Sequence, residues 1–171
     1  MAGTRHGDDP SAVGWGETGP NPTDRAKCGT KRTLLTDGGG IPLAVAIAGA
    51  NRPDYQLARE TLENVNIEQP EPTPEEPQGL CLDKGFDFDE VRELAEEFCY
   101  TTHMPRRGEA AIAVQREAGK KARRWGVERT HSWLNRFRRI LVRWEKKPQN
   151  YLAMLHLACA LITYRATGLL G

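Results

Sequence analysis

Residues 31–50 read KRTLLTDGGGIPLAVAIAGA, and this stretch decides the fold of the chain. Two apolar segments flank the sequence Asp-Gly-Gly-Gly at 37–40, whose residues tolerate a positive φ. In the second segment, 41–50, alternate residues from Leu43 to Ile47 are large and apolar. Apolar segments on both sides of a glycine-rich turn predict a β-hairpin with strands at 31–36 and 41–50.

The rest of the chain shows helical and strand patterns in alternation. The expected elements, in chain order, are a helix at 54–65, a strand at 79–82, a helix at 88–98, a strand at 100–105, a helix at 120–144 and a closing helix at 150–163. Asp54 is the expected N-cap of the first helix, and Asp87 with Glu90 forms a capping box before the second. This order predicts an α/β fold with a mixed sheet flanked by helices.

Length and composition limit the class of protein. A chain of 171 residues suits one domain, and residues 1–18, which are rich in glycine and lack periodicity, form an expected poorly ordered leader. The longest apolar stretch is too short to span a bilayer, and the N-terminus lacks the apolar region of a secretory signal. Four cysteines without a C-x-x-C pair fit a reducing compartment, so the expectation is a cytoplasmic protein with no membrane partner.

The charges are segregated along the chain although the net charge is only +1. Between 54 and 97 there are 14 acidic and 3 basic residues, whereas between 106 and 147 there are 14 basic and 4 acidic residues. The basic C-terminal third has the sign of charge that a phosphate backbone attracts. The alternative is a solvated helix face that balances the acidic half, and charge alone does not decide between them.

One carboxylate of the basic segment lies in the middle of a basic, solvent-directed stripe of the predicted helix. At about 100° per residue, the expected helix at 120–144 places Glu128 on a basic side, with Trp133, Phe137 and Trp144 on the opposite packing side. The alternative is an ordinary ion pair between Arg124 and Glu128, which contributes only about 0.3–0.5 kcal/mol on a surface.

A second carboxylate, Asp83, follows the expected strand at 79–82. The C-terminal ends of strands are where α/β sheets place ligands and catalytic groups, although an acid there can equally be a turn or cap residue. Asp83 and Glu128 would offer the hard oxygen ligands that Mg²⁺ prefers. Two such ions about 3.5–4 Å apart would activate a water or a 3′-hydroxyl in phosphodiester transfer. The pattern is consistent with this chemistry but does not require it.

Four motifs stand near the start of the chain: Gly19-Pro-Asn-Pro-Thr-Asp-Arg25, Gly29-Thr-Lys-Arg32, Leu34-Leu-Thr-Asp37 and Gly49-Ala-Asn-Arg52. Together they resemble the opening of the core of a bacterial insertion-sequence DDE transposase. Leu82-Asp-Lys-Gly-Phe-Asp87 is similar to the strand that bears the second catalytic Asp of the family. Residues 123–139, RRWGVERTHSWLNRFRR, are similar to its signature helix. The resemblance implies an RNase H-like fold over a core at 19–167.

The resemblance also implies the site and its partners. Asp83 resembles the second acid and Glu128 the third, both as metal ligands for Mg²⁺ or Mn²⁺, and Arg124 resembles the Arg of the R-(3)-E pattern. The implied partner is double-stranded DNA at the ends of the element, in the bacterial cytoplasm and nucleoid. The residues expected to bind DNA are Lys31, Arg32, Lys121, Arg129, Arg136, Arg139 and Arg143.

The sequence departs from the family before Gly19. The first catalytic Asp is expected there on a strand, but Met1 to Thr18 does not read as a strand. Asp8 or Asp9 could stand in for the missing acid, or both could belong to an unrelated leader. The expectation is a truncated or downstream-frame core that lacks its first strand and has impaired activity. Alternatives are a non-catalytic DNA-binding remnant, which acts alone, as a homodimer or with a full-length transposase, and a nuclease of the same fold.

Overall fold

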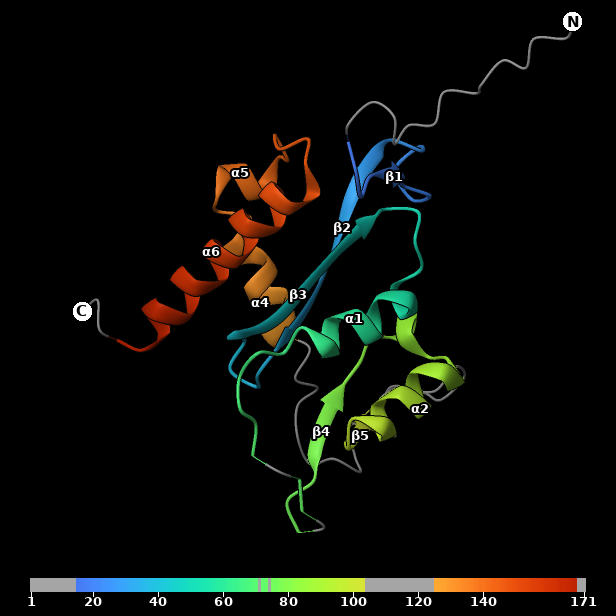
Figure 1. Cartoon of the computed structure of the whole chain (residues 1–171), viewed down its shortest axis with the longest axis vertical. Helices are drawn as coiled ribbons and strands as arrows, with labels where there is room; N and C mark the ends of the chain where they lie inside the picture. The colour runs from blue at the N-terminus through green and yellow to red at the C-terminus, as the bar shows by residue number, and fades with distance from the viewer. Residues whose placement is uncertain (1–14, 71, 74, 104–124, 169–171) are drawn as a thin grey trace, which may run out of the picture.

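The computed structural model describes residues 15–70, 72–73, 75–103 and 125–168 (Figure 1). Its elements, in chain order, are β1 (Gly19–Pro20), β2 (Cys28–Thr36), β3 (Pro42–Gly49), η2 (Asp54–Leu57), α1 (Ala58–Glu63), β4 (Gln78–Cys81), η3 (Lys84–Phe86), α2 (Asp89–Glu97), β5 (Tyr100–His103), α4 (Trp125–Leu134), α5 (Arg138–Leu141) and α6 (Pro148–Ala166). Of the predicted segments, 1–14 and 104–124 lie outside the described residues.

The predicted hairpin is confirmed. β2 and β3 pair in antiparallel fashion from Thr30 opposite Gly49 to Thr36 opposite Pro42. Asp37 closes the turn, because its Oδ1 accepts hydrogen bonds from the amides of Gly39 and Ile41, each at 2.8 Å. Gly40 adopts a φ of 81°, which an L side chain rarely does.

The strands form two sheets. β1, β2 and β3 make an antiparallel sheet, and β4 pairs with β5 in parallel. The predicted α/β class with both strand orientations is therefore confirmed, but the prediction of one mixed sheet is wrong for the described residues. The reason is that no described strand lies between β2 and β4 to carry hydrogen bonds from one sheet to the other.

β2 contributes side chains to two hydrophobic cores, because successive side chains of a strand point to opposite faces. Leu34 packs with β3 and with the helices α4, α5 and α6, where Leu134 and Leu155 are fully buried. Leu35 packs against the second core, which α1, α2 and β4 build around Ala95. The hairpin thus joins the N-terminal half of the chain to the C-terminal helices.

The expected long helix at 120–144 is broken in its described part. α4 ends at Leu134, and the next amides, Arg136 and Phe137, bond to carbonyls three residues back, which tightens the backbone. Phe137 is extended before α5 begins. The break changes the direction of the residues after it, so Trp144, predicted on the packing face, is 70% exposed.

Two predicted caps are also wrong. Asp54 does not cap the first helix, which begins after Pro53 as a 3-10 turn; its carboxylate pairs with Lys31 instead. Asp87 pairs with Arg92, and the N-cap of α2 is Phe88 instead. In both cases a nearby cation competes successfully with the helix amides for the carboxylate.

The closing helix α6 packs on β3 as predicted and is longer at both ends. All four cysteines are free thiols, in agreement with the sequence. Within the described ranges, no helix has the length and apolar character needed to cross a bilayer.

Candidate active site

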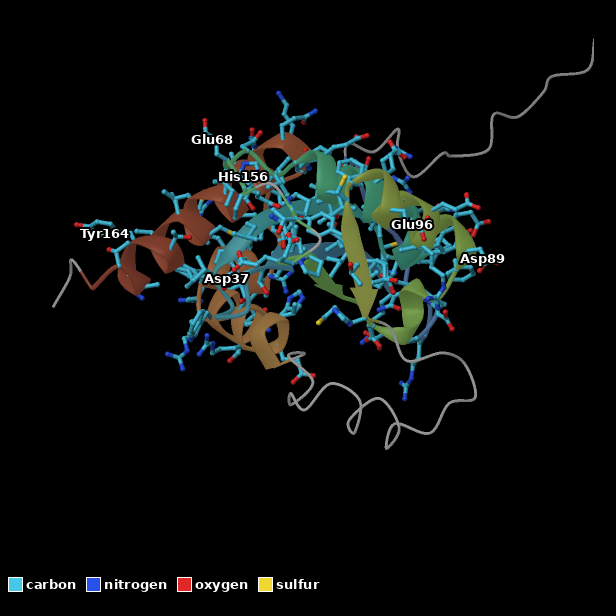
Figure 2. The ribbon with its side chains drawn as sticks, turned by 90° about the horizontal axis from the view of Figure 1, so that it is seen from below. Asp37, Glu68, Asp89, Glu96, His156 and Tyr164 are labelled. Carbon is cyan, nitrogen blue, oxygen red and sulfur yellow. The ribbon has the colours of Figure 1, made fainter. Side chains whose placement is uncertain are left out.

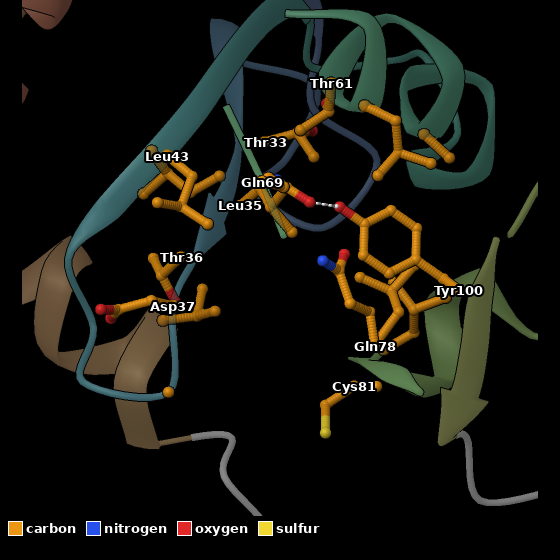
Figure 3. Close-up of a pocket in the computed structure, with 18 of the residues that line it drawn as sticks. Thr33, Leu35, Thr36, Asp37, Leu43, Thr61, Gln69, Gln78, Cys81 and Tyr100 are labelled. Atoms are coloured by element: carbon orange, nitrogen blue, oxygen red, sulfur yellow. Dashed lines mark hydrogen bonds between the residues drawn. The ribbon is translucent and has the colours of Figure 1, made fainter. Parts of the chain in front are cut away.

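A cavity of about 620 Å³ separates the two sheets (Figure 3). Its lining comes from β2 and the following turn, from α1, from β4 and from the start of α4. Asp83 and Glu128 both line it, so the fold brings together the two acids that the sequence singled out. Asp37 lines the same cavity.

Asp83 is placed by the end of β4. The pairing of β4 with β5 extends one step beyond Cys81, because the amide of Leu82 donates to the carbonyl of His103 at 3.3 Å. The carbonyl of Asp83 then accepts from the amide of Phe86 at 2.9 Å, and η3 turns the chain away. Asp83 is therefore an exposed residue at the point where a strand gives way to a tight turn.

Glu128 is placed by the contact between α4 and the hairpin turn. The hydroxyl of Thr130 is fully buried within hydrogen-bond distance of the carbonyls of Gly40 and Gly126. A Cβ added to Gly40 would lie only 2.9 Å from the carbonyl oxygen of Gly126, so the backbones approach closely. This contact holds the first turns of α4 against the end of the hairpin, with Glu128 exposed toward the cavity.

Asp37 is the acid that the sequence reasoning assigned only to the turn. Its Oδ1 is occupied by two amides of that turn. A carboxylate directly after a strand was the signal that could have marked it as a cavity residue. Within the described parts of the chain, no three His, Cys, Asp or Glu side chains gather closely enough to hold a metal ion.

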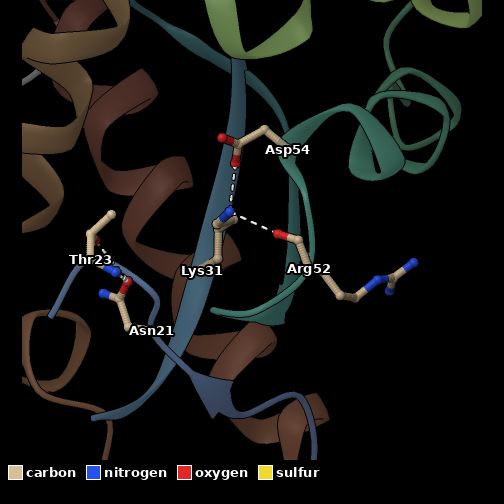
Figure 4. Close-up of polar contacts among 5 residues, drawn as sticks. All are labelled: Asn21, Thr23, Lys31, Arg52 and Asp54. Atoms are coloured by element: carbon tan, nitrogen blue, oxygen red, sulfur yellow. Dashed lines mark hydrogen bonds and ion pairs between the residues drawn. The ribbon is translucent and has the colours of Figure 1, made fainter. Parts of the chain in front are cut away.

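Lys31 and Arg32 point to opposite faces of β2. Lys31 Nζ lies 2.9 Å from Asp54 and donates to the carbonyl of Arg52 at 2.8 Å (Figure 4). Arg32 faces the helices and donates to Asn135 Oδ1 at 2.9 Å. Neither is a simple exposed cation, because each is half-buried and engaged within the chain.

Arg143 links separate segments of the chain through hydrogen bonds. Its guanidinium donates to the carbonyls of Gly16, Glu17, Glu145 and Lys146 and to the hydroxyl of Thr30. Its charge lies 5.3 Å from the ring centroid of Tyr151, and burial lowers the pKa of the guanidinium. These contacts fasten the segment before β1 to the segment before α6.

The other basic residues lie on or near α4 and α5. The guanidinium of Arg129 lies 4.7 Å from the ring centroid of Trp133. Arg136 and Arg139 are exposed, and Arg139 also pairs with Glu145 at 2.8 Å. Further exposed cations in this region are Arg138, Lys146 and Lys147. The predicted residues Lys121 and Arg124 lie outside the described residues.

The acids of α2 lie far from the end of α6. Figure 2 places Asp89 and Glu96 of α2 at the end of the molecule away from Tyr164 of α6, with Asp37 between them. Burial, and secondarily the charge of Arg32, lower the pKa of His131 on α4.

The fold is therefore α/β, with carboxylates in a cavity near helices that carry exposed cations. The Transposase DDE domain family matches residues 3–163, so the chain belongs to this family. A relative from Burkholderia cepacia, named "Putative transposase for insertion sequence element IS402", is 36% identical over 158 residues, which cover 88% of this chain and 71% of the relative. No solved structure matches the chain significantly.

Proposed function

We propose that the chain acts in DNA transposition by metal-dependent strand cleavage and strand transfer, with Asp83 and Glu128 as metal ligands. Family membership supports transposition in general, together with DNA binding and a divalent metal. The observation that supports this metal site is that both acids line one cavity although they lie far apart in the sequence.

The oxygen atoms that these two acids offer are of the chemical type that binds a divalent metal ion. Asp83 and Glu128 supply carboxylate oxygens, which suit Mg²⁺ or Mn²⁺. When bound, the metal would activate the attacking hydroxyl and stabilise the leaving oxygen. The residues of the chain would orient the ion and, through the basic surface, hold the DNA strand. Arg124, separated from Glu128 by three residues as in the R-(3)-E pattern, is proposed as a further catalytic residue.

We propose that catalysis is impaired when only these two acids are present. The candidates for the first acid of the family in the sequence are Asp8 and Asp9, which lie outside the described residues. The order β3-β2, cavity, β4-β5 is consistent with an RNase H-like sheet that lacks one strand among the described residues. Two carboxylates hold two ions poorly, because each ion needs six or more oxygen ligands.

The DNA surface is proposed on α4, α5 and the segment that follows. Arg136 and Arg139 are exposed there, and Arg129 lies on the same helix as Glu128. Lys31, Arg32 and Arg143 have contacts within the chain, which make them weaker candidates for phosphate binding. Lys121 remains a candidate from the sequence.

A non-catalytic DNA-binding remnant is the second candidate function. It is favoured by the observation that the described residues hold no group of three metal ligands. Such a protein would occupy the ends of the element, or would join a complete transposase, without cutting DNA.

The test is nicking of a supercoiled plasmid that carries the ends of the encoding element, with Mg²⁺ or Mn²⁺. We expect weak nicking that Asp83→Asn and Glu128→Gln each abolish, while Asp89→Asn, an exposed acid on α2, leaves it unchanged. Nicking that survives both substitutions would contradict the catalytic proposal. DNA binding without nicking in the unaltered protein would support the remnant.

A further inference from the structure

The motif Gly49-Ala-Asn-Arg-Pro-Asp54 forms a restrained corner between β3 and η2. The amide of Arg52 donates to the carbonyl of Gly49 at 3.0 Å, which closes a turn. Pro53 follows with φ −60° and ψ 146°, and its ring restricts φ to this range. The carbonyl of Arg52 and the carboxylate of Asp54 therefore lie on either side of a residue whose backbone has little freedom. The proposed metal site uses no residue of this motif.

Lys31 holds this corner against β2. Its Nζ lies 2.9 Å from Asp54 Oδ1 and donates to the carbonyl of Arg52 at 2.8 Å (Figure 4). The side chain of Lys31 is 26% exposed and that of Asp54 is 45% exposed. An ion pair with this much access to water contributes little to overall stability. Its effect is instead geometric, because one ammonium group fixes the start of η2 relative to a residue of the strand.

η2 in turn contacts the segment that follows Asp83. The Oδ2 of Asp54 lies 3.4 Å from the position that a Cβ of Gly85 would take, so the carboxylate faces η3. The next residue, Tyr55, packs its ring on that of Phe88, with the ring centroids 4.2 Å apart and the planes inclined at 34°. The first two residues of η2 therefore hold the chain between 85 and 88.

This packing bears on the place of both cavity acids. The amide of Phe86 donates to the carbonyl of Asp83 at 2.9 Å, so the backbone of Asp83 moves with η3. Glu128 is held by the contact of α4 with the turn that follows β2. β2 is thus a common reference for the two acids: Lys31, nearer its start, acts on Asp83, and the turn at its end acts on Glu128.

We propose that Lys31 and Asp54 are positioning residues for Asp83. They act through η2 and η3, and contact neither the metal nor the DNA. Their part in catalysis rests on the proposed metal site, whereas the physical link from Lys31 to the turn after Asp83 does not depend on it. The closing experiment therefore reads the two separately.

The first measurement is hydrogen exchange of the Phe86 amide, followed by NMR in the full chain. We expect Lys31→Met and Asp54→Ala each to speed this exchange about tenfold, because the turn loses its restraint while the fold is kept. Lys31→Arg retains a cation and should stay within about twofold of the unaltered protein. The amides of the β2–β3 hairpin should exchange as before. Lys27 pairs with Asp24 at 3.5 Å instead, so Lys27→Met is the matched control and should leave Phe86 unchanged.

Two outcomes of this measurement would overturn the proposal. Unchanged exchange of Phe86 in Lys31→Met would show that the ion pair does not restrain the turn. An equal acceleration of Phe86 and of the hairpin amides would show a loss of overall stability instead of a local role.

The second measurement is Mn²⁺ binding, followed by electron paramagnetic resonance. We expect Lys31→Met to weaken Mn²⁺ binding about fivefold and Asp83→Asn to weaken it further, because the first change misplaces a ligand that the second removes. Weaker binding in Asp83→Asn together with normal binding in Lys31→Met would overturn the positioning role. If Asp83→Asn binds Mn²⁺ normally, the metal site itself is wrong, and the exchange of Phe86 still decides whether Lys31 orders the turn.

Discussion

Neighbouring residues in this protein have different roles because a strand alternates its side chains. Lys31 pairs with Asp54 on the α1 side of β2, whereas Arg32 lies on the helix side beside Asn135. A count of the charges along the sequence does not distinguish Lys31 from Arg32. At the scale of the residue, the face of the strand decides which acceptors a cation reaches.

His131 should make the stability of the fold depend on pH. Burial, with a smaller contribution from Arg32, lowers the pKa of this imidazole below its ordinary value of 6.5. The unfolded chain then binds more protons than the folded chain below that value, so stability is complete above about pH 6.5 and falls as the pH decreases through the folded pKa.

Urea unfolding at pH 7.5 and 5.5 measures this effect. The loss of stability on acidification should be smaller in His131→Gln than in the unaltered protein, whereas His156→Gln, an exposed imidazole on α6, should leave it as it is. Identical losses in all three proteins would show that His131 does not contribute to the pH dependence.

Arg143 should contribute to stability and not to DNA binding. Arg143→Met removes the donors to Gly16, Glu17 and Thr30, and we expect unfolding to become easier by roughly 1–3 kcal/mol. Arg138→Met, at an exposed position on α5, should change stability by less than about 0.5 kcal/mol. Chemical denaturation and a DNA-binding isotherm on the same samples separate the two roles.

At the scale of the element, the contact between the hairpin turn and α4 positions the site. Thr130 joins α4 to Gly40, and the absence of a side chain at Gly40 lets the two backbones approach. The turn therefore fixes the helix that carries Glu128, so its distance from Asp83 depends on the hairpin. A change in the turn should affect both stability and any activity of the cavity acids.

Two glycine substitutions should have different outcomes. Gly40→Ala places a Cβ at a φ of 81° and 2.9 Å from a carbonyl oxygen, so we expect a loss of about 1–3 kcal/mol. Gly126→Ala meets its nearest atoms at 3.5 Å, an ordinary contact, and should change stability by less than about 0.5 kcal/mol. Thermal unfolding of both variants is the measurement, and equal losses would contradict the proposed contact.

At the scale of the whole molecule, charge is divided between two halves. α1 and α2 carry acids such as Asp89 and Glu96, and the segment from α4 to the start of α6 carries several exposed cations. The net charge of +1 conceals this division. DNA should therefore approach one side of the protein, with a strong dependence on salt.

Arg136→Gln should weaken DNA binding equally for all sequences and reduce the slope of log K against log salt by about one. Arg59→Gln removes the same charge from the acidic half, where Arg59 pairs with Glu97, and should leave the slope unchanged. Fluorescence anisotropy at several salt concentrations measures both slopes. A normal slope for Arg136→Gln would exclude that residue from the phosphate contacts.

The sequence by itself determined the hairpin, the boundaries of most helices and two of the acids that line the cavity. Turn chemistry and apolar periodicity act over a few residues, so they can be read directly from 31–50 or 148–166. The family resemblance, carried by local motifs around Asp83 and Glu128, is confirmed by the family match. The catalytic roles of these acids remain predictions.

Only the tertiary structure decided how these parts meet. It showed that the sheet is divided at a cavity, that the long helix breaks after Leu134, and that Arg143 is used inside the protein. The sequence pattern likewise does not predict that α4 packs against Gly40. Each of these features depends on contacts between residues distant in the chain, and local propensity carries no information about which distant group will supply a hydrogen bond or a packing surface.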